Sequence, residues 1–277
     1  MTLRTSGPPT LVGVPYDASS SFERGAAEAP ALIREQMASP AGNHFSEDLR
    51  DLGAEGAVRD AGDLTLPASA EARAAIEAGI ARIVAGGGRP LALGGDHSVT
   101  YPILRGLNPG RAPLAILHID AHGDLYDDFE GDRYSHACPF ARILEEGLAS
   151  RLVQVGIRTQ TPHQRDQAER FAVEVIDMRA WVAGRRPEIA GPVYVSIDLD
   201  GLDPSAAPGV AHREPGGLTV REVLTLIQAL GGPIVGGDVV ELNPHRDLDR
   251  VTARVAAKLT KELAAAMLRT ARPGTTT

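Results

Sequence analysis

The sequence predicts an α/β fold, a three-layer α/β/α sandwich with a mostly parallel central sheet. Two observations lead to this prediction. Short apolar runs rich in β-branched residues alternate along the chain with longer segments whose apolar residues recur at helical spacing. The short runs are nearly continuous in apolar residues, as strands covered on both faces must be. Their alternation with helices implies βαβ crossovers, which place helices on both faces of a parallel sheet.

The expected elements can be placed along the chain. The helix expected over 71–87 ends in Gly86-Gly87, a suitable C-terminal cap. Residues 39–63 are polar and rich in glycine, which predicts surface structure of no defined shape. We expect one domain over residues 1–270 and a disordered tail at 271–277. The expected strands lie at 11–14, 90–96, 114–124, 152–158, 173–177, 193–203 and 233–243, and the further helices at 140–148, 219–232 and 250–268.

The composition is typical of a globular protein and argues against several classes of partner. Hydrophobic residues make up 43% of the 277 residues and charged residues 23%. A net charge of −8 disfavours binding to nucleic acid or to anionic membranes, and an aromatic content of 4% disfavours stacking on single strands. The single cysteine, Cys138, excludes an internal disulfide and a cysteine-built metal site. Since we find neither a membrane-spanning apolar run nor a signal-peptide pattern, we expect a cytoplasmic location.

Polar residues gather where four of the expected strands end. His97 follows the strand at 90–96, and Glu241 lies near the end of the strand at 233–243. Alternate residues of an extended segment share a face, and ligands bind at the carboxyl ends of parallel strands. The polar side chains of the other two strands are Asp120, His122, Asp124, Asp198 and Asp200. We therefore expect all of these side chains to converge on one site.

The charge of this set predicts metal ions. Four carboxylates and two neutral imidazoles carry a formal charge of about −4, which is costly to bury without compensation. Two divalent cations neutralise it, and bridging carboxylates hold such a pair about 3.5–4 Å apart. A single DxD or DxHxD motif is typical of a solvated loop. Three strand ends that each carry such polar residues together favour a dinuclear hydrolytic site. Oxygen ligands with two imidazoles suit Mn²⁺, with Ni²⁺, Co²⁺ and Fe²⁺ as alternatives. The expected metal ligands are His97, Asp120, His122, Asp124, Asp198 and Asp200.

Longer motifs resemble those of the arginase–agmatinase (ureohydrolase) superfamily. The resemblance runs nearly end to end and includes the segments at 13–35 and 214–223. Residues 134–147 and 209–218 are most similar to plant arginases and bacterial agmatinase-like proteins. The motifs around the expected ligands are GGDHS at 94–98, DAHGD at 120–124, SIDLDGLDPSAAPG at 196–209 and DVVELNP at 238–244.

The resemblance implies a role for each matching residue. Asp120 and Asp198 would bridge two metal ions, and Asp124 would relay a proton. His136 would shuttle protons beside the substrate, and Glu241 would face the substrate guanidinium. The family fold is an α/β/α sandwich that usually holds two Mn²⁺ ions, and a homo-oligomer, a trimer or hexamer, is expected. The implied ligands are His97, Asp120, Asp124 and Asp198 for one ion, and Asp120, His122, Asp198 and Asp200 for the other.

Other positions keep more than one interpretation. Gly123, Ala137 and the segment 21–30 depart from the commoner family pattern, which places the substrate pocket in question and leaves the ligands intact. Asp96 either orients the metal site or caps a helix, and His212 either touches substrate or lies on the surface. Structural roles are expected for His118, Asp203 and Cys138.

The predicted activity is hydrolysis of a guanidino substrate to urea and an amine. The loop at 125–135 contains four acids and one arginine. If these acids face the pocket, they repel a carboxylate and favour agmatine, which is the substrate we expect; if they are solvated, this argument fails. The similarity to plant arginases supports the alternatives, L-arginine or another guanidino acid. A non-catalytic binding or regulatory member of the fold is the alternative from a different class.

Overall fold

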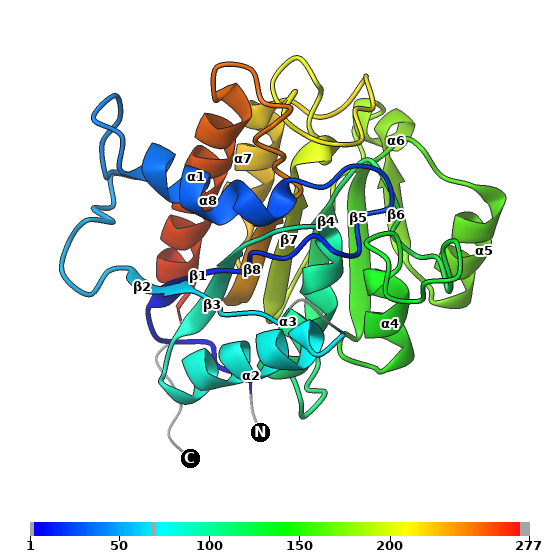
Figure 1. Cartoon of the computed structure of the whole chain (residues 1–277), viewed down its shortest axis with the longest axis horizontal. Helices are drawn as coiled ribbons and strands as arrows, with labels where there is room; N and C mark the ends of the chain where they lie inside the picture. Colours follow the sequence, from blue (N-terminus) through cyan, green and yellow to red (C-terminus); the bar gives the residue numbers. More distant parts are fainter. Residues whose placement is uncertain (1–2, 68–69, 272–277) are drawn as a thin grey trace.

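The protein is built around one eight-stranded sheet (Figure 1). The computed structural model describes residues 3–67 and 70–271, so the expected tail lies outside it except for residue 271. Within that part every strand pair is parallel, which confirms the predicted fold class. In sheet order the strands are β2 (Arg59–Asp63), β1 (Pro9–Gly13), β3 (Arg89–Leu93), β8 (Ile234–Val240), β7 (Val193–Asp198), β4 (Ala115–Ile119), β5 (Arg151–Ile157) and β6 (Glu174–Asp177).

Helices cover both faces of the sheet (Figure 1). The sheet therefore separates two apolar cores, one on each face. Helices α1 (Ala29–Met37), α7 (Val220–Ala229) and α8 (Val251–Arg269) pack together on one face. Helices α2 (Ala72–Ala85), α3 (Thr100–Leu107) and α4 (Pro139–Glu145) cover the other. Strand β4 shows how one strand serves both cores: Leu117 and Ile119 join the first, while Ile116 joins the second.

The seven expected strands and four expected helices all form, and the unexpected elements have physical explanations. Strand β2 falls in the segment expected to lack a defined shape; it reads RDAGD, is exposed throughout, and pairs only with β1 at the sheet edge. Helix α3 has only eight residues, fewer than the window of about 11–18 residues over which helical periodicity can be recognised. Helix α5 (Pro162–Arg170) is strongly polar and is started by a capping box. Helix α1 and the short helix α6 (Met178–Val182) were not expected either; α1 has Pro30 in its first turn, and α6 is started by the Asp177 side chain, which accepts the backbone N–H of Ala180 at 2.7 Å.

The chain topology opens a crevice at the carboxyl edge of the sheet. After β3 and β4 the chain continues to α3 and α4 on one face, whereas after β7 and β8 it continues to α7 and α8 on the other. Neighbouring strands whose connections leave toward opposite faces create a ligand-binding crevice at their carboxyl ends. This condition holds for the pairs β3–β8 and β7–β4. In the described residues, we find no helix that combines the length and apolar character of a membrane span.

Candidate metal centre

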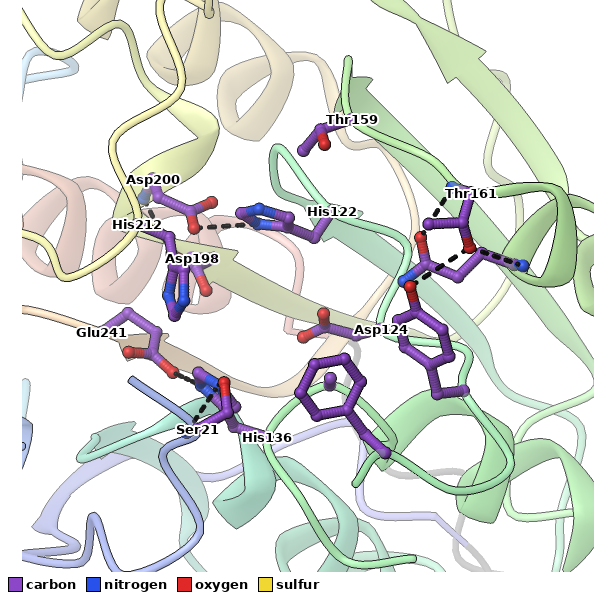
Figure 2. Close-up of a pocket in the computed structure, with 14 residues that line it drawn as sticks. Ser21, His122, Asp124, His136, Thr159, Thr161, Asp198, Asp200, His212 and Glu241 are labelled. Carbon is purple, nitrogen blue, oxygen red and sulfur yellow. Dashed lines mark hydrogen bonds and ion pairs between the residues drawn. The ribbon is translucent and has the colours of Figure 1, made fainter. Parts of the chain in front are cut away.

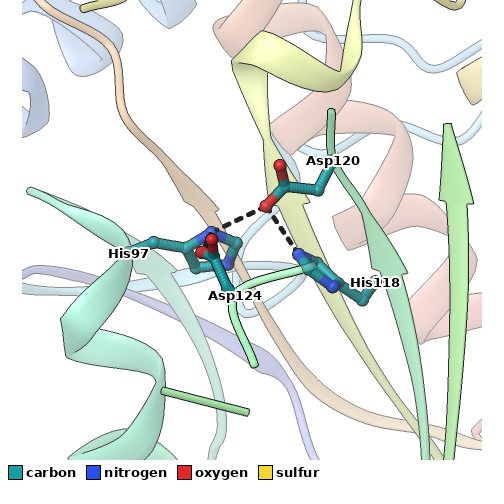
Figure 3. Close-up of side chains that lie close together, drawn as sticks. All are labelled: His97, His118, Asp120 and Asp124. Atoms are coloured by element: carbon teal, nitrogen blue, oxygen red, sulfur yellow. Dashed lines mark hydrogen bonds and ion pairs between the residues drawn. The ribbon is translucent and has the colours of Figure 1, made fainter. Parts of the chain in front are cut away.

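Three carboxylates surround one nitrogen of a buried histidine. His97 begins the turn after β3, and its Nδ1 atom lies 3.1 Å from Asp120 Oδ2, 3.2 Å from Asp124 Oδ2 and 3.1 Å from Asp198 Oδ2. Figure 3 shows His97 and Asp124 on one side of Asp120. Among the described residues, this ring nitrogen has no hydrogen-bond partner. The buried nitrogen has no hydrogen-bond partner, and three carboxylate oxygens surround it. Together these four atoms form a ligand set that fits a divalent cation.

A second group shares Asp120 with the first. His122 Nδ1 lies 3.0 Å from Asp200 Oδ2 and 3.4 Å from Asp120 Oδ1. Asp120 therefore turns one oxygen toward each group, as a bridging carboxylate does. Asp198 differs, because its Oδ1 accepts the backbone N–H of Asp200 at 2.7 Å. The structure thus brings all six expected ligands together and displays bridging geometry at Asp120.

The side chains of this cluster have strongly displaced pKa values. Burial, followed by repulsion from Asp200 and Asp120, raises the pKa of Asp198 well above its usual range. Burial and Asp120 raise the pKa of Asp200 to about 6. Burial also acts to raise the pKa of Asp120, but His118, His122 and His97 hold it well below its usual range. Without cations, the cluster must therefore share protons among its acids.

His136 and Glu241 form a buried pair beside the cluster. His136 Nδ1 lies 2.8 Å from Glu241 Oε1, which also accepts the backbone N–H of His97 at 2.8 Å. Burial acts to lower the pKa of His136, but the Glu241 carboxylate overrides it and raises this pKa to about 9. On the other ring nitrogen, Nε2, the backbone N–H of Ser21 donates at 3.1 Å and Ser21 Oγ lies at 2.8 Å.

Backbone geometry fixes two of these side chains at some cost. Asp124 and Glu241 have φ values of 49° and 65°, in the left-handed region that residues with a side chain rarely adopt. Glu241 directly follows β8, Asp124 lies in the segment after β4, and both line the same cavity. Such conformations persist only where the surrounding structure enforces them, and they concentrate at functional sites.

The side chains surround a cavity of about 160 Å³. Figure 2 shows Ser21, His136 and Glu241 on one side of it and Thr159 and Thr161 on the opposite side. His97 and Asp120 lie beneath, almost fully buried. Six expected site residues line the cavity, namely His122, Asp124, His136, Asp198, Asp200 and Glu241.

Sequence reasoning missed several residues that line this cavity. They are Ser21, Thr159, Thr161 and Gln164. A signal was present for two of them, since Thr159 and Thr161 directly follow an expected strand and so lie at a carboxyl end. The signal for Ser21 was weaker, because this residue lies far along the chain from every metal motif.

The acids of the loop at 125–135 do not line the cavity, to which the loop contributes Tyr126 and Phe129. Asp127 Oδ1 lies 3.0 Å from His163 Nε2. Asp128 and Asp132 accept backbone N–H groups within the loop, at 2.9 Å and 2.8 Å. The cavity lining therefore favours the alternative in which these acids are solvated, and the argument for agmatine loses its support.

The structure also places the residues whose roles were open. His118 Nε2 lies 2.7 Å from Asp120 Oδ2, so this histidine supports a cluster residue. His212 belongs to the cavity wall, with its ring 5.4 Å from that of His136. Asp203 accepts the backbone N–H groups of Ser205, Gly216 and Gly217 and shapes a turn.

Asp96 performs the capping function that was one of its two interpretations. Its Oδ1 accepts the backbone N–H of Ser98 at 3.1 Å at the start of the turn that carries His97. Its Oδ2 accepts the backbone N–H of Ser19 at 3.0 Å, which ties the N-terminal segment to the end of β3. Asp96 thus joins the two segments that present His97 and Ser21. Cys138 is fully buried, as a packing role requires.

With this geometry established, comparisons with known proteins identify the family. The model of the Arginase family matches residues 9–266. The chain belongs to the arginase family. It is 46% identical to a mitochondrial arginase from Medicago truncatula over 93% of this chain and 81% of that protein, and 35% identical to a human mitochondrial guanidino acid hydrolase over 93% and 77%. A solved arginase structure from Medicago truncatula superposes with a TM-score of 0.90 at 44% identity, covering 95% of this chain and 88% of the other.

These findings establish the class of activity and correct one expectation. The chain is a ureohydrolase, an enzyme with a binuclear metal centre that acts on a guanidino substrate, and dependence on Mn²⁺ is typical of its family. The expected cytoplasmic location is wrong on this comparison. The similar arginases from Medicago truncatula, Oryza sativa and Arabidopsis thaliana are named as mitochondrial proteins.

Proposed function

We propose that this ureohydrolase is an arginase, which hydrolyses L-arginine to ornithine and urea. The observation that carries the proposal is the similarity of nearly the whole chain to proteins named arginase. The cavity supports it, because the loop acids that would repel an α-carboxylate lie outside the wall. L-Arginine thus replaces agmatine as the preferred substrate. Another guanidino acid is the second candidate, since relatives named guanidino acid hydrolase and guanidinopropionase are also similar.

In this proposal the clustered side chains hold two divalent ions. Asp120 and Asp198 would each help to hold both ions, as the family resemblance implies. When bound, such a pair supplies Lewis-acid polarisation and a water nucleophile at neutral pH. Mn²⁺ is the proposed metal, because it is typical of the family. The ligands are His97, Asp120, Asp124 and Asp198 for one ion, and Asp120, His122, Asp198 and Asp200 for the other.

The remaining cavity residues bind and orient the substrate. Glu241 accepts charge-assisted hydrogen bonds from the guanidinium and holds its carbon over the metal cluster. Asp124 relays a proton, and His136 carries protons between the departing amine and solvent. Across the cavity, Thr159 and Thr161 offer neutral hydroxyl groups toward the amino-acid end of the substrate. Neutral hydroxyls can bond an α-carboxylate without repelling it.

A substrate panel tests the proposal. Urea release should be measured with Mn²⁺ for L-arginine, agmatine, 3-guanidinopropionate and 4-guanidinobutyrate. We expect kcat/KM for L-arginine to exceed that for agmatine by at least ~10-fold, equivalent to about 1.4 kcal/mol. A higher value for agmatine would reject the arginase assignment while leaving the ureohydrolase class intact.

The variant Asp127→Asn is the matched control. Asp127 carries one of the loop charges but pairs with His163 outside the cavity. Its substitution should leave the ratio of kcat/KM for L-arginine to agmatine unchanged. A shift toward L-arginine in this variant would show that the loop acids do act on the substrate. Assembly into a trimer or hexamer stays a prediction, which light scattering can check.

A further inference from the structure

We propose that Asp238 positions His97 for metal binding by acting through Ser196. His97 Nε2 lies 2.9 Å from Ser196 Oγ, and Ser196 Oγ donates to Asp238 Oδ1 at 2.7 Å. The three side chains are 1%, 0% and 0% exposed. The inference rests on the proposed role of His97 as a metal ligand and deepens it, because it explains which ring nitrogen faces the metal ions.

The direction of each hydrogen bond follows from the partners of Asp238. Its Oδ2 accepts the hydroxyl of Tyr194 at 2.6 Å and that of Thr100 at 2.9 Å, while its Oδ1 accepts that of Ser196. Each of these three hydroxyl groups donates to Asp238, so the Ser196 proton is committed to that side chain. The hydroxyl oxygen of Ser196 then has only lone pairs to offer His97.

His97 must therefore carry its proton on Nε2. The nitrogen left to bind a cation is Nδ1, the atom that lies among Asp120, Asp124 and Asp198 and has no hydrogen-bond partner among the described residues. A partner on the second ring nitrogen fixes the tautomer and the ring orientation of a metal-binding histidine, and its loss costs about 10- to 100-fold in metal affinity.

The rest of the ring environment cannot substitute for this hydrogen bond. The backbone N–H of His97 donates to Glu241, which holds the main chain but not the imidazole. The nearby rings of His118 and Phe140 meet it edge-on, with centroids 5.0 Å and 5.3 Å away. Edge contacts limit the space around the ring but do not distinguish its two nitrogens. Ser196 is therefore the contact that does so.

Asp238 acts at a distance from the substrate. It lies within β8 and is fully buried, and the cavity wall does not include it. Its side chain reaches β7 through Tyr194 and Ser196 and the start of α3 through Thr100. Asp238 is therefore a positioning residue. Its substitution should lower Mn²⁺ affinity by more than its effect on the unfolding of the metal-free protein explains.

Titration calorimetry of Mn²⁺ into chelator-treated protein tests the inference. The wild-type protein should bind two ions; binding of fewer would reject the proposed metal centre itself. Ser196→Ala and Asp238→Asn should each weaken one of the two sites by about 10- to 100-fold and leave the other nearly unchanged. The double variant should be no weaker than the singles, because both substitutions break the same chain of bonds. Ser196→Thr, which keeps the hydroxyl, should restore the affinity.

Tyr194→Phe is the matched control. It removes a buried donor from the same carboxylate but leaves the bonds from Asp238 through Ser196 to His97 in place. Urea unfolding in chelator should show a loss of stability comparable to that of Ser196→Ala, with both Mn²⁺ affinities kept. Wild-type affinities in Ser196→Ala, or an equal loss of affinity in Tyr194→Phe, would overturn the proposal.

Discussion

Replacing Asp198 with asparagine should stabilise the metal-free protein. Asp198 is 3% exposed, and burial, followed by Asp200 and Asp120, raises its pKa well above the ordinary 3.8. Keeping this carboxyl protonated at pH 7 costs at most about 4 kcal/mol, at 1.36 kcal/mol for each pH unit above 3.8. Because the folded pKa is the higher one, the cost is present at pH 7 and vanishes as the pH falls toward the unfolded value. An asparagine of the same shape has no such cost.

The net gain should be smaller than this bound. The amide oxygen can still accept the backbone N–H of Asp200, which Asp198 accepts at 2.7 Å. The variant loses the close contact between the Asp198 carboxyl group and His97, whose Nδ1 is 3.1 Å away. We therefore expect metal-free Asp198→Asn to be about 2 kcal/mol more stable than the wild-type protein at pH 7. The difference should close near pH 4.

Urea unfolding followed by circular dichroism, in EDTA and in Mn²⁺, measures the effect. Each metal site that binds only the folded state adds about 2.7 kcal/mol at 100 times its Kd. The wild-type protein should gain this stability in Mn²⁺, and Asp198→Asn should lose most of it. A variant less stable than the wild-type protein in EDTA would refute the reasoning about buried repulsion.

Asp203→Asn is the control, because this substitution should change the free energy of unfolding in the opposite direction. Hydrogen bonds from the Ser205 hydroxyl and backbone, and from the Gly216 backbone, lower the pKa of Asp203 to about 2. A carboxylate with a lowered folded pKa stabilises the protein above its unfolded pKa. Asp203→Asn should therefore reduce stability at pH 7 by a similar amount in EDTA and in Mn²⁺.

Three further predictions follow from the site. In the proposed function His136 moves protons and binds no ion, so His136→Ala should lower kcat by about 100-fold while plasma emission shows unchanged metal content; loss of an ion would reassign it. Burial and Asp124 raise the pKa of the Cys138 thiol to about 12, so a thiol reagent at pH 8 should label it only after denaturation, and rapid native labelling would contradict its burial. Gly95→Ala would place a Cβ 1.7 Å from the Tyr16 carbonyl oxygen and displace the segment that carries Ser21. It should cost about 1–3 kcal/mol of stability, measured by urea unfolding, and an unchanged unfolding midpoint would show that the segment yields freely.

The parts of the fold that sequence could predict are those set by local pattern. Residues 114–119 are apolar except for His118 because β4 is covered by helices on both faces, and a strand forms there over Ala115–Ile119. Strand β2 could not be found this way, since its five residues are exposed and only the neighbouring β1 makes them a strand. Its existence depends on pairing between distant segments, which leaves no periodic trace in the sequence.

The metal cluster was predictable for a different reason. Five of its six expected ligands, all but His97, are spaced by two along the chain at the ends of β4 and β7, and parallel topology alone brings these strand ends together. The hydrogen bonds that join different elements around the site could not be predicted from residue spacing. Ser21 reaches His136, 115 residues away, through bonds that depend on how the N-terminal segment crosses the end of β3. No local pattern encodes such a crossing.

The substrate preference shows why charge counted along a loop can mislead. Four acids in eleven residues suggest a negative pocket mouth, but the field at a substrate depends on where each carboxylate points and on what pairs with it. Asp127 pairs with His163 of the neighbouring helix α5, while Asp128 and Asp132 cap backbone N–H groups of their own loop. Acidic residues are common in loops for this capping role, which turns their oxygens toward the main chain. The apolar Tyr126 and Phe129 of this loop face the cavity instead. The loop therefore contributes shape to the pocket, and we propose that selection between L-arginine and agmatine depends on the hydroxyl groups of Thr159 and Thr161 across it.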